Sequence, residues 1–317
     1  MALTEVMMNA EITARAPATL SNLGPGFDSL GAALTGWEDE VRILLTPAPP
    51  YSVEYDVDGV WSGTVEPNEN TASLAAMEVG KVLGYTGGAR ITIKKGIRAG
   101  SGLGSSAASA VAGAVAMNAA LGCRLSTQEL IVPSLIGESA ASGVNHGDNV
   151  LPCLLGGVVV LESGDPMHHA HVVVGNRLHI AVIFPDIQVF TMQARGVLPE
   201  FVSMTDTTAW ASRLGLLINA FNQGDIEQIG RLIMSDRIVE PRRATLLEPY
   251  QNIKNRALLN GAMGCALSGS GPSMFAICDN ESVAQTVCAG MKETCERDGI
   301  SGTVQVVEIN LKGAYIV

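Results

Sequence analysis

A glycine- and serine-rich stretch that runs directly into a row of small apolar residues sets the strongest limit on this fold. It reads GIRAGSGLGSSAASAVAGAVAMNAALG and covers residues 96–122. The row from residue 105 predicts a helix that ends at Gly122, and its small side chains allow very close packing against a sheet. The glycines before it permit unusual backbone angles and close approaches. Because a helix start offers free N–H groups and a positive dipole end, this junction favours a bound phosphate.

The stretch matches neither of the two common phosphate-loop patterns. A P-loop requires G-x-x-x-x-G-K-[ST], and no lysine follows here; the glycines at 100, 102 and 104 also miss the G-x-G-x-x-G spacing. Ser105 and Ser106 could cap the helix, bind a phosphate or ligate a metal. Taken alone, the stretch is equally consistent with an ordinary capped helix after a flexible turn.

Three further stretches concentrate polar residues in turns, at 16–31 (APATLSNLGPGFDSLG), 137–149 (GESAASGVNHGDN) and 267–273 (LSGSGPS). An acidic protein that holds a triphosphate needs amide-rich loops and an acidic residue for Mg²⁺, and together these stretches supply both. Their candidate polar side chains are Asn22, Asp28, Glu138, Asn145, His146, Asp148 and Asn149.

Composition limits the classes of partner. The net charge of −11 argues against a nucleic-acid or anionic membrane surface, which requires basic patches. No segment approaches the roughly 20 apolar residues of a membrane span, and the first residues lack the apolar region of a signal peptide. We therefore expect a cytoplasmic protein with reduced cysteines, and we consider a homodimer. A cluster of three histidines is expected in a turn that feeds a strand, rather than in a metal site: His168, His169 and His171.

The order of strand and helix patterns predicts an α+β protein with two domains, residues 1–165 and 166–317, each a sheet covered by helices. A length of 317 residues suits two domains, because single cores stop growing near roughly 250–300 residues. The polar stretch 163–171 is the expected boundary. After it, a strand pair is expected to turn at Gly175–Asn176.

One predicted helix in the first domain carries its own start signal. Ser126 and Glu129 form a capping-box pattern, and a break is expected near Pro133. The helix is therefore expected to start at this capping box, with Ser126 as its cap, and to be interrupted near the proline.

Three motifs, PATLSNLGPGFDSLG, GSGLGSSAAS and ALSGSGPS, resemble in this order the three motifs of the GHMP kinase superfamily. The resemblance covers essentially the whole chain. Within the superfamily, NLGPGFD, SGVNHGDNV, QARGVLP and DRIVEPRR are similar to homoserine kinases, and the galactokinase and mevalonate kinase forms of the first motif are not present.

This resemblance implies a fold and a reaction. The N-terminal domain should be like domain 2 of ribosomal protein S5, and the C-terminal domain should be ferredoxin-like. The chain should bind ATP with Mg²⁺ and transfer the γ-phosphoryl group to the hydroxyl of L-homoserine, giving O-phospho-L-homoserine for threonine synthesis. Adenine contacts are expected around residues 60–95.

The resemblance also implies a nucleotide and metal site. Ser106 and Glu138 would hold Mg²⁺, a hard cation that prefers oxygen ligands. The C-terminal glycine loop would supply a second phosphate-like turn, made of Ser268, Gly269, Ser270 and Gly271. The ATP phosphates would lie against Gly100, Ser101, Gly102, Leu103, Gly104, Ser105 and Ser106.

The amino-acid substrate is assigned in the same way. Asn22 and Asp28 would contact its ammonium group. Arg195 and Arg243 would bind its carboxylate, which suits the paired donors of guanidinium, and Arg242 is the alternative to Arg243. His146 and Asn149 would line the pocket near the reacting hydroxyl.

The expected catalytic residues are Ser106, Glu138 and Asn149. Some GHMP kinases have a basic Asp where this chain has Asn149, with Asp148 beside it. Since Asn cannot accept a proton, we predict that no dedicated side-chain base operates; phosphoryl transfer tolerates this because positioning and charge stabilise its transition state.

Two departures from the usual motifs and two alternatives stay open. Leu20–Ser21 precedes Asn22 where other residues are typical, and Arg98 replaces a common proline and is expected to point to solvent. The fold could instead phosphorylate another small alcohol, such as shikimate or a mevalonate-type acid, or it could act as a non-catalytic ligand-binding regulator. An ammonium partner at Asp28 disfavours the first alternative, and intact metal positions disfavour the second.

Overall fold

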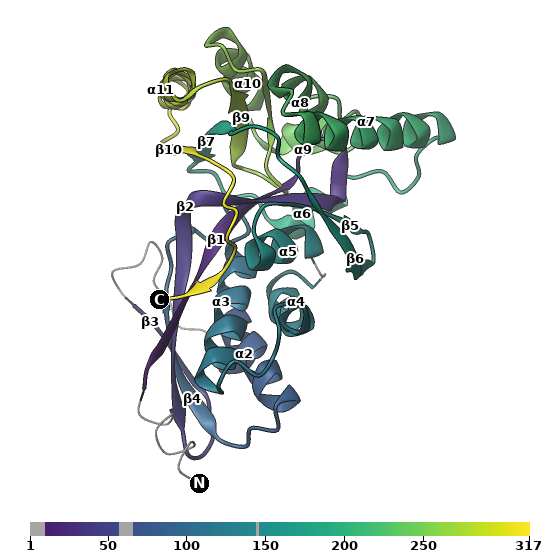
Figure 1. The fold of residues 1–317 in the computed structure, drawn as a ribbon. Coiled ribbons are helices and arrows are strands. Elements are labelled where there is room, and N and C mark those ends of the chain that lie inside the picture. Colours follow the sequence, from purple (N-terminus) through teal and green to yellow (C-terminus); the bar gives the residue numbers. More distant parts are fainter. Residues whose placement is uncertain (1–9, 57–65, 144–145) are drawn as a thin grey trace.

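The computed structural model describes residues 10–56, 66–143 and 146–317, and it has two halves, each built on one sheet (Figure 1). Asn145 and the first part of the expected adenine region, residues 60–65, lie outside the described residues. The N-terminal half comprises residues 10–172, and the C-terminal half comprises residues 179–307.

The N-terminal half is organised by one long strand. β2 (Gly26–Thr46) pairs with β1 (Ile12–Asn22) on one side; on the other, its second part pairs with β4 (Gly88–Lys94) and its first part with β5 (Val158–Glu162). The described residues form a seven-stranded sheet that runs β11-β1-β2-β4-β3, with β5 paired to β2 and β6 paired to β5. The remaining strands are β3 (Ser52–Tyr55), β6 (Asp165–Val172) and β11 (Tyr315–Ile316).

Helices cover one side of this sheet, as Figure 1 shows. They are α2 (Thr71–Val82), α3 (Ser105–Ala120), α4 (Ile131–Ser142) and α5 (Gly147–Leu155), with 3₁₀ turns η1 (Pro67–Glu69) and η2 (Gln128–Leu130). The predicted small-residue helix is α3, and it is buried along nearly all of its length. At Gly113 a Cβ atom would lie 2.3 Å from the Ala72 carbonyl oxygen, so α2 and α3 are in backbone contact. Small side chains are what make this close crossing possible.

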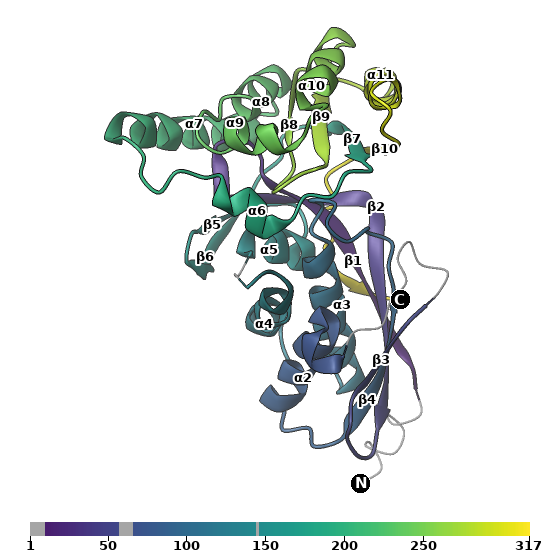
Figure 2. The ribbon, with the colours of Figure 1, turned by 180° about the vertical axis from the view of Figure 1, so that it is seen from behind.

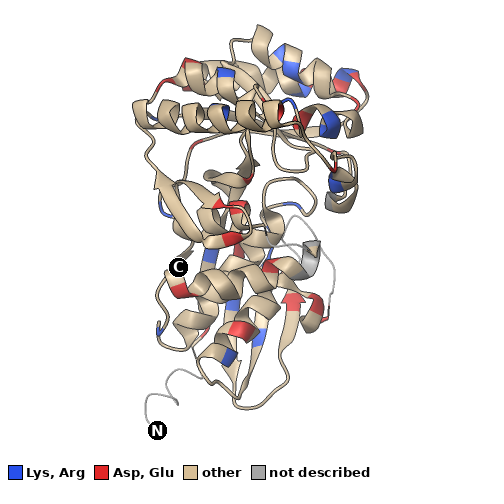
Figure 3. Cartoon of the chain, turned by 90° about the vertical axis from the view of Figure 1, so that its right-hand side faces the viewer, with Lys and Arg blue, Asp and Glu red and all other residues tan. Residues whose placement is uncertain are grey.

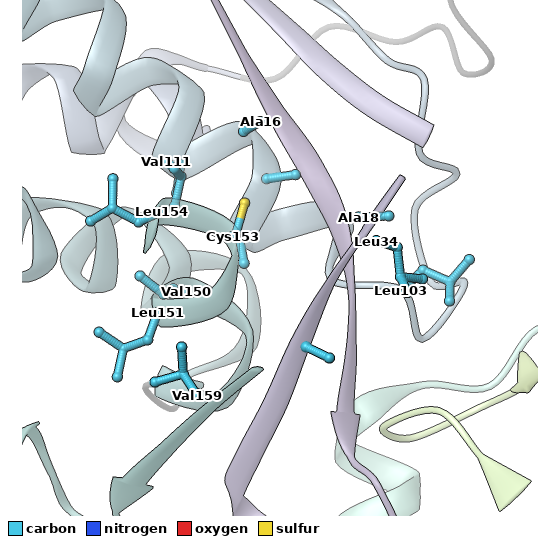
Figure 4. Close-up of a cluster of buried hydrophobic side chains, with 14 of the residues drawn as sticks. Ala16, Ala18, Leu34, Leu103, Val111, Val150, Leu151, Cys153, Leu154 and Val159 are labelled. Atoms are coloured by element: carbon cyan, nitrogen blue, oxygen red, sulfur yellow. The ribbon is translucent and has the colours of Figure 1, made fainter. Parts of the chain in front are cut away.

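The core of the N-terminal half lies between these helices and the sheet. Figure 4 shows Val111 of α3 and Val150, Leu151 and Leu154 of α5 beside the strands that carry Ala16, Ala18 and Leu34. Alanines on the strands thus face larger aliphatic side chains on α5.

The C-terminal half has a four-stranded antiparallel sheet in the order β10-β7-β9-β8. Its strands are β7 (His179–Pro185), β8 (Gly264–Leu267), β9 (Met274–Cys278) and β10 (Gly302–Val307). Its helices are α6 (Thr191–Gly196), α7 (Met204–Gln223), α8 (Ile226–Ile233), α9 (Glu240–Arg243), α10 (Tyr250–Leu259) and α11 (Glu281–Arg297), with η3 (Ala244–Leu246). This β-α-β-β-α-β order is ferredoxin-like, as predicted.

Alternate residues of β7 pack into two different cores. Ala181 and Ile183 belong to a separate cluster with α10 and α11, whereas Ile180 and Val182 join the main core together with α7 and α8. The main core therefore extends from one half into the other.

The division of the chain differs from the expected one. Residues 165–172 form β6, which pairs with β5, so the first sheet extends to Val172, and we propose that the linker follows that residue. The predicted hairpin at Gly175–Asn176 is wrong, because β6 and β7 belong to different sheets. The last strand also returns to the first sheet: Ile309 bridges Leu34, and β11 pairs with β1. Alternating patterns predict strands, but they do not say which sheet a strand joins.

Two local predictions need correction. The Ser126–Glu129 capping box forms, with the Ser126 N–H donating to Glu129 Oε2 at 2.8 Å, but it caps the 3₁₀ turn. The break falls at Ile131, where α4 begins, and Pro133 lies in the first turn of α4, where its missing N–H is not needed. His168, His169 and His171 lie on β6 rather than in a turn.

Charged residues of both signs are spread over this architecture. In Figure 3, Lys and Arg positions are interspersed with Asp and Glu positions over both halves. Across the described ranges, no helix is both long enough and apolar enough to cross a membrane.

Candidate active site

A pocket of about 350 Å³ opens between the two halves, and most of the predicted site residues line it. Both ribbon views place α6 at this junction (Figures 1 and 2). The predicted residues in the lining are Asn22, Asp28, Gly100, Ser101, Gly102, Gly104, Ser105, Ser106, Glu138, His146, Asn149, Arg195, Arg243, Gly269 and Ser270.

The glycine-rich loop owes its course to three left-handed residues. Gly100, Gly102 and Gly104 have φ values of 70°, 76° and 67°, which side chains rarely adopt. Gly104 is the N-cap of α3, and no side chain caps the helix there. Ser105 Oγ instead donates to the Ile97 carbonyl at 2.8 Å. The first N–H groups of α3 are therefore left to an anion, as a phosphate site requires.

A buried ion network behind the loop was missed by sequence reasoning. Asp39 is fully buried; its Oδ1 accepts from the Gly96 and Ile97 N–H groups at 3.1 and 3.0 Å, and its Oδ2 pairs with Lys95. Ser109 Oγ also donates to Asp39, at 2.7 Å. The available signal was strand parity: Asp39 occupies a core-facing position of β2, and the buried Lys95, directly after β4, continues the alternation of that strand.

This network fixes the start of α3 to the sheet. The Lys95 ammonium donates to the Ser105 carbonyl at 3.1 Å and to Ser109 Oγ at 2.9 Å. The chain therefore does have a lysine at the loop, but it lies directly after β4, ahead of the glycines. Arg98 is half-exposed and pairs with Asp186 across the two halves at 2.6 Å, so it points neither into the pocket nor freely into solvent.

Ser106 and Glu138 form the pair that fits a cation. Glu138 is 2% exposed, and Ser106 Oγ donates to its Oε1 at 3.3 Å. The described residues contain no group of three or more His, Cys, Asp or Glu side chains suited to a metal. In general, Mg²⁺ is held in proteins by one or two carboxylates together with substrate phosphates and water.

His146 is tied to the same carboxylate. Its N–H donates to Glu138 Oε2 at 3.2 Å, and its Nδ1 lies 3.0 Å from Oε1. Burial alone would lower the pKa of His146, but the hydrogen bond and negative charge of Glu138 raise it above its ordinary value. His146 therefore carries positive charge more readily than a free histidine does.

The turn between β1 and β2 presents Asn22 and Asp28. Both have positive φ, 73° and 54°, and Asn22 Oδ1 accepts the Asp28 N–H at 3.3 Å. Asp28 pairs with Arg195 of α6 at 3.1 Å. Arg195 Nε is buried and has no hydrogen-bond partner within the described part of the chain, so one edge of this guanidinium is open to an acceptor.

Arg243 reaches the pocket and Arg242 does not. Arg243 is 5% exposed and donates to the Gly269 carbonyl at 2.7 Å and to the Ala194 carbonyl at 3.3 Å. Arg242 turns back to the Ile238 carbonyl on its own segment. Burial lowers the pKa of Arg243 to about 10, so it remains charged at neutral pH.

Asp148 and Asn149 lie side by side at the start of α5. Asn149 Oδ1 accepts from Thr19 Oγ1 at 2.7 Å, and Asn149 Nδ2 lies 3.4 Å from Asp148 Oδ1. Asp148 is 2% exposed and also lines the pocket. Burial, and after it the negative charge of Asp28, raises the pKa of Asp148 to about 7.

The C-terminal glycine loop mainly supports the first loop. Ser268 Oγ donates to the Gly102 carbonyl at 2.6 Å, and a Cβ atom on Gly102 would lie within 2.7 Å of the Ser268 and Gly271 carbonyl oxygens. Ser268 is buried and Gly271 lies behind the loop, whereas Gly269 and Ser270 line the pocket. Leu103 is also buried, behind the lining.

Comparison with family models defines the class of protein. Residues 70–157 match the model for the N-terminal domain of GHMP kinases, and residues 217–297 match the model for the C-terminal domain. Both halves that form the pocket are thus those of a GHMP kinase.

Comparison with individual proteins gives the family within that class. The chain is 40% identical to a homoserine kinase from Pyrococcus abyssi, over 90% of this chain and 92% of that protein, and 35% identical to one from Arabidopsis thaliana, over 95% and 83%. Its structure matches the crystal structure of homoserine kinase from Cytophaga hutchinsonii with a TM-score of 0.90 and 36% identity, over 98% of both chains. An L. major mevalonate kinase matches with a TM-score of 0.73 at 16% identity, which shows the shared fold alone. The chain belongs to the homoserine kinase family.

Proposed function

We propose that this protein transfers the γ-phosphoryl group of ATP to the hydroxyl of L-homoserine and releases ADP and O-phospho-L-homoserine, a step of threonine biosynthesis. The observation that carries this proposal is the set of residues that line one pocket. An uncapped helix start suited to phosphate lies in the same pocket as Asp28, Arg195 and Arg243, whose charges match an amino acid. Family membership supports the same reaction.

ATP would bind with its phosphates on the loop of residues 100–106. The N–H groups at the start of α3 and its dipole attract the phosphates, and the Asp39–Lys95 pair holds this helix start in place. Ser106 and Glu138 would hold Mg²⁺, which when bound neutralises charge on the phosphate oxygens.

The amino acid would bind at the opposite end of the pocket. Its ammonium group would lie against Asp28 and Asn22, and its carboxylate against Arg195 and Arg243, because guanidinium groups bind carboxylates through paired hydrogen bonds. The hydroxyl would then lie near His146 and Asn149, between the amino-acid end and the loop.

The proton of the hydroxyl has no dedicated acceptor in this proposal. Bringing the hydroxyl and phosphate together supplies most of the rate enhancement for such a transfer. Asp148 is the residue that tests this view, because its raised pKa suits proton transfer. We expect Asp148→Asn to retain turnover within about tenfold; a loss of about two orders of magnitude or more, with fold and substrate affinity intact, would identify Asp148 as the general base.

An ADP-release assay with MgATP tests the reaction directly. We expect turnover with L-homoserine and none with shikimate or mevalonate, which lack the ammonium group that Asp28 would bind. Glu138→Gln should abolish turnover, while Glu293→Gln, on the exposed face of α11, should not change it. Absence of turnover with homoserine would refute the proposal. The cytoplasmic location and the homodimer stay predictions from the sequence.

A further inference from the structure

Phe27 lies between the two arginines of the amino-acid end. It is half-buried in β2, next to Asp28, and its ring centre lies 5.7 Å from Arg195 Cζ and 5.1 Å from Arg243 Cζ. The Trp210 ring of α7 lies 6.3 Å away, tilted by 34°. The Phe27 ring thus lies close to the guanidinium groups of Arg195 in α6 and Arg243 in α9, which are almost fifty residues apart in the sequence.

The two guanidinium groups need such a neighbour because they repel each other. The pKa of Arg243 is lowered first by burial; the negative charge of Asp28 opposes this, and the positive charge of Arg195 lowers the pKa further. Arg195 has a carboxylate partner in Asp28, but the hydrogen bonds of Arg243 go to the neutral carbonyls of Ala194 and Gly269. The face of an aromatic ring carries negative charge density and attracts a guanidinium within about 6 Å. Phe27 is thus a neutral group that attracts both arginines at once.

The position of Phe27 is itself fixed. Asp28 follows it with φ of 54°, and the Asp28 N–H is held by Asn22. The ring therefore extends from a constrained turn of one half toward two helices of the other. The open, buried Nε edge of Arg195 shows that this arrangement leaves a donor for an incoming acceptor.

We infer that Phe27 is a positioning residue that aligns Arg195 and Arg243 for the carboxylate of the substrate and so contributes to selection of an amino acid over a plain amino alcohol. This inference rests on the proposed function. It assigns Phe27 no contact with the reacting atoms: the ring acts on the two arginines, and the arginines act on the carboxylate.

The test compares Phe27→Leu with Phe27→Tyr. Leucine fills similar space without a π face, so we expect the KM for L-homoserine to rise about tenfold, with kcat within about twofold and the KM for ATP unchanged. Tyrosine keeps the ring and should restore a KM close to that of the unaltered protein. Phe201→Leu removes an exposed aromatic residue between α6 and α7, away from the arginines, and should change nothing.

A second substrate separates alignment from a merely structural effect. 3-Aminopropan-1-ol is homoserine without its carboxylate, so Phe27→Leu should leave its kcat/KM unchanged. Equal losses for both alcohols, a matching rise in the KM for ATP, or no recovery with Phe27→Tyr would overturn the inference. Failure of the unaltered protein to phosphorylate homoserine would refute the proposed function itself, so the two failures are distinguishable.

Discussion

At the scale of single residues, Asp148 is a buried carboxyl group that lies near the negative charge of Asp28. Its carboxyl group lies almost out of water in a pocket that also contains Asp28, and both conditions disfavour the ionised form. A pKa of about 7 means that ionising the Asp148 carboxyl group at neutral pH costs free energy in the folded protein.

This cost predicts that the difference in stability between the unaltered protein and Asp148→Asn depends on pH. The pKa of Asp148 is 3.8 when unperturbed and about 7 in the fold, so between these pH values the folded state binds more protons than the unfolded state. The stabilising contribution is fully present below about pH 4 and is lost as pH rises through about 7. Relative to Asp148→Asn, the unfolding free energy of the unaltered protein should fall by at most about 1.4 kcal/mol per pH unit in this window. Thermal unfolding of both proteins from pH 4.5 to 8 measures this difference, and parallel curves would contradict it.

At the scale of elements, two of the three left-handed glycines in the glycine-rich loop, Gly100 and Gly104, have different surroundings. A Cβ atom on Gly104 would lie 2.0 Å from Thr19 Oγ1, while one on Gly100 would meet nothing within 4 Å. Their φ values are nearly equal, so backbone strain is matched between the two positions.

We therefore expect Gly104→Ala to raise the KM for ATP by more than tenfold and to lower Tm. Gly100→Ala should cost only the strain of a left-handed residue, about 1–2 kcal/mol. Steady-state kinetics with varied ATP, together with thermal unfolding, measure both effects. Similar effects of the two substitutions would show that strain, and not the contact with Thr19, limits the loop.

At the scale of the whole molecule, the C-terminal residues connect the two halves. β10 belongs to the second sheet, and after it Ile309 bridges Leu34 and β11 pairs with β1. The C-terminal segment of residues 308–317 thus completes an edge of the first sheet.

Removing this segment by a stop after Val307 should lower the Tm of the whole protein. The main core runs through both halves, so we expect one cooperative unfolding transition at a lower temperature. Calorimetry measures this. An unchanged Tm, or a second transition that leaves the C-terminal half at its original temperature, would show that the segment does not stabilise both halves.

The sequence predicts the elements of this fold better than their connections. Periodicity and caps predict α2, α3 and α11, and the motifs predict most of the pocket lining. The same patterns cannot assign β6 or β11 to the first sheet, because strand alternation reports a buried face and not a pairing partner. They also miss the Asp39–Lys95 pair, because strand parity places Asp39 on the buried face but does not show which basic residue lies against it.

The pairing of β11 with β1 also has a consequence for folding during synthesis on the ribosome. A ribosome releases the N-terminal half first, and among the described residues the edge of β1 at Ala14 and Arg15 gains its partner strand only when residues 315–316 emerge, after the whole C-terminal half. During that interval the exposed strand edge can pair with another nascent chain. Residues 315–316, which are synthesised after the whole C-terminal half, thus add a strand to the first sheet.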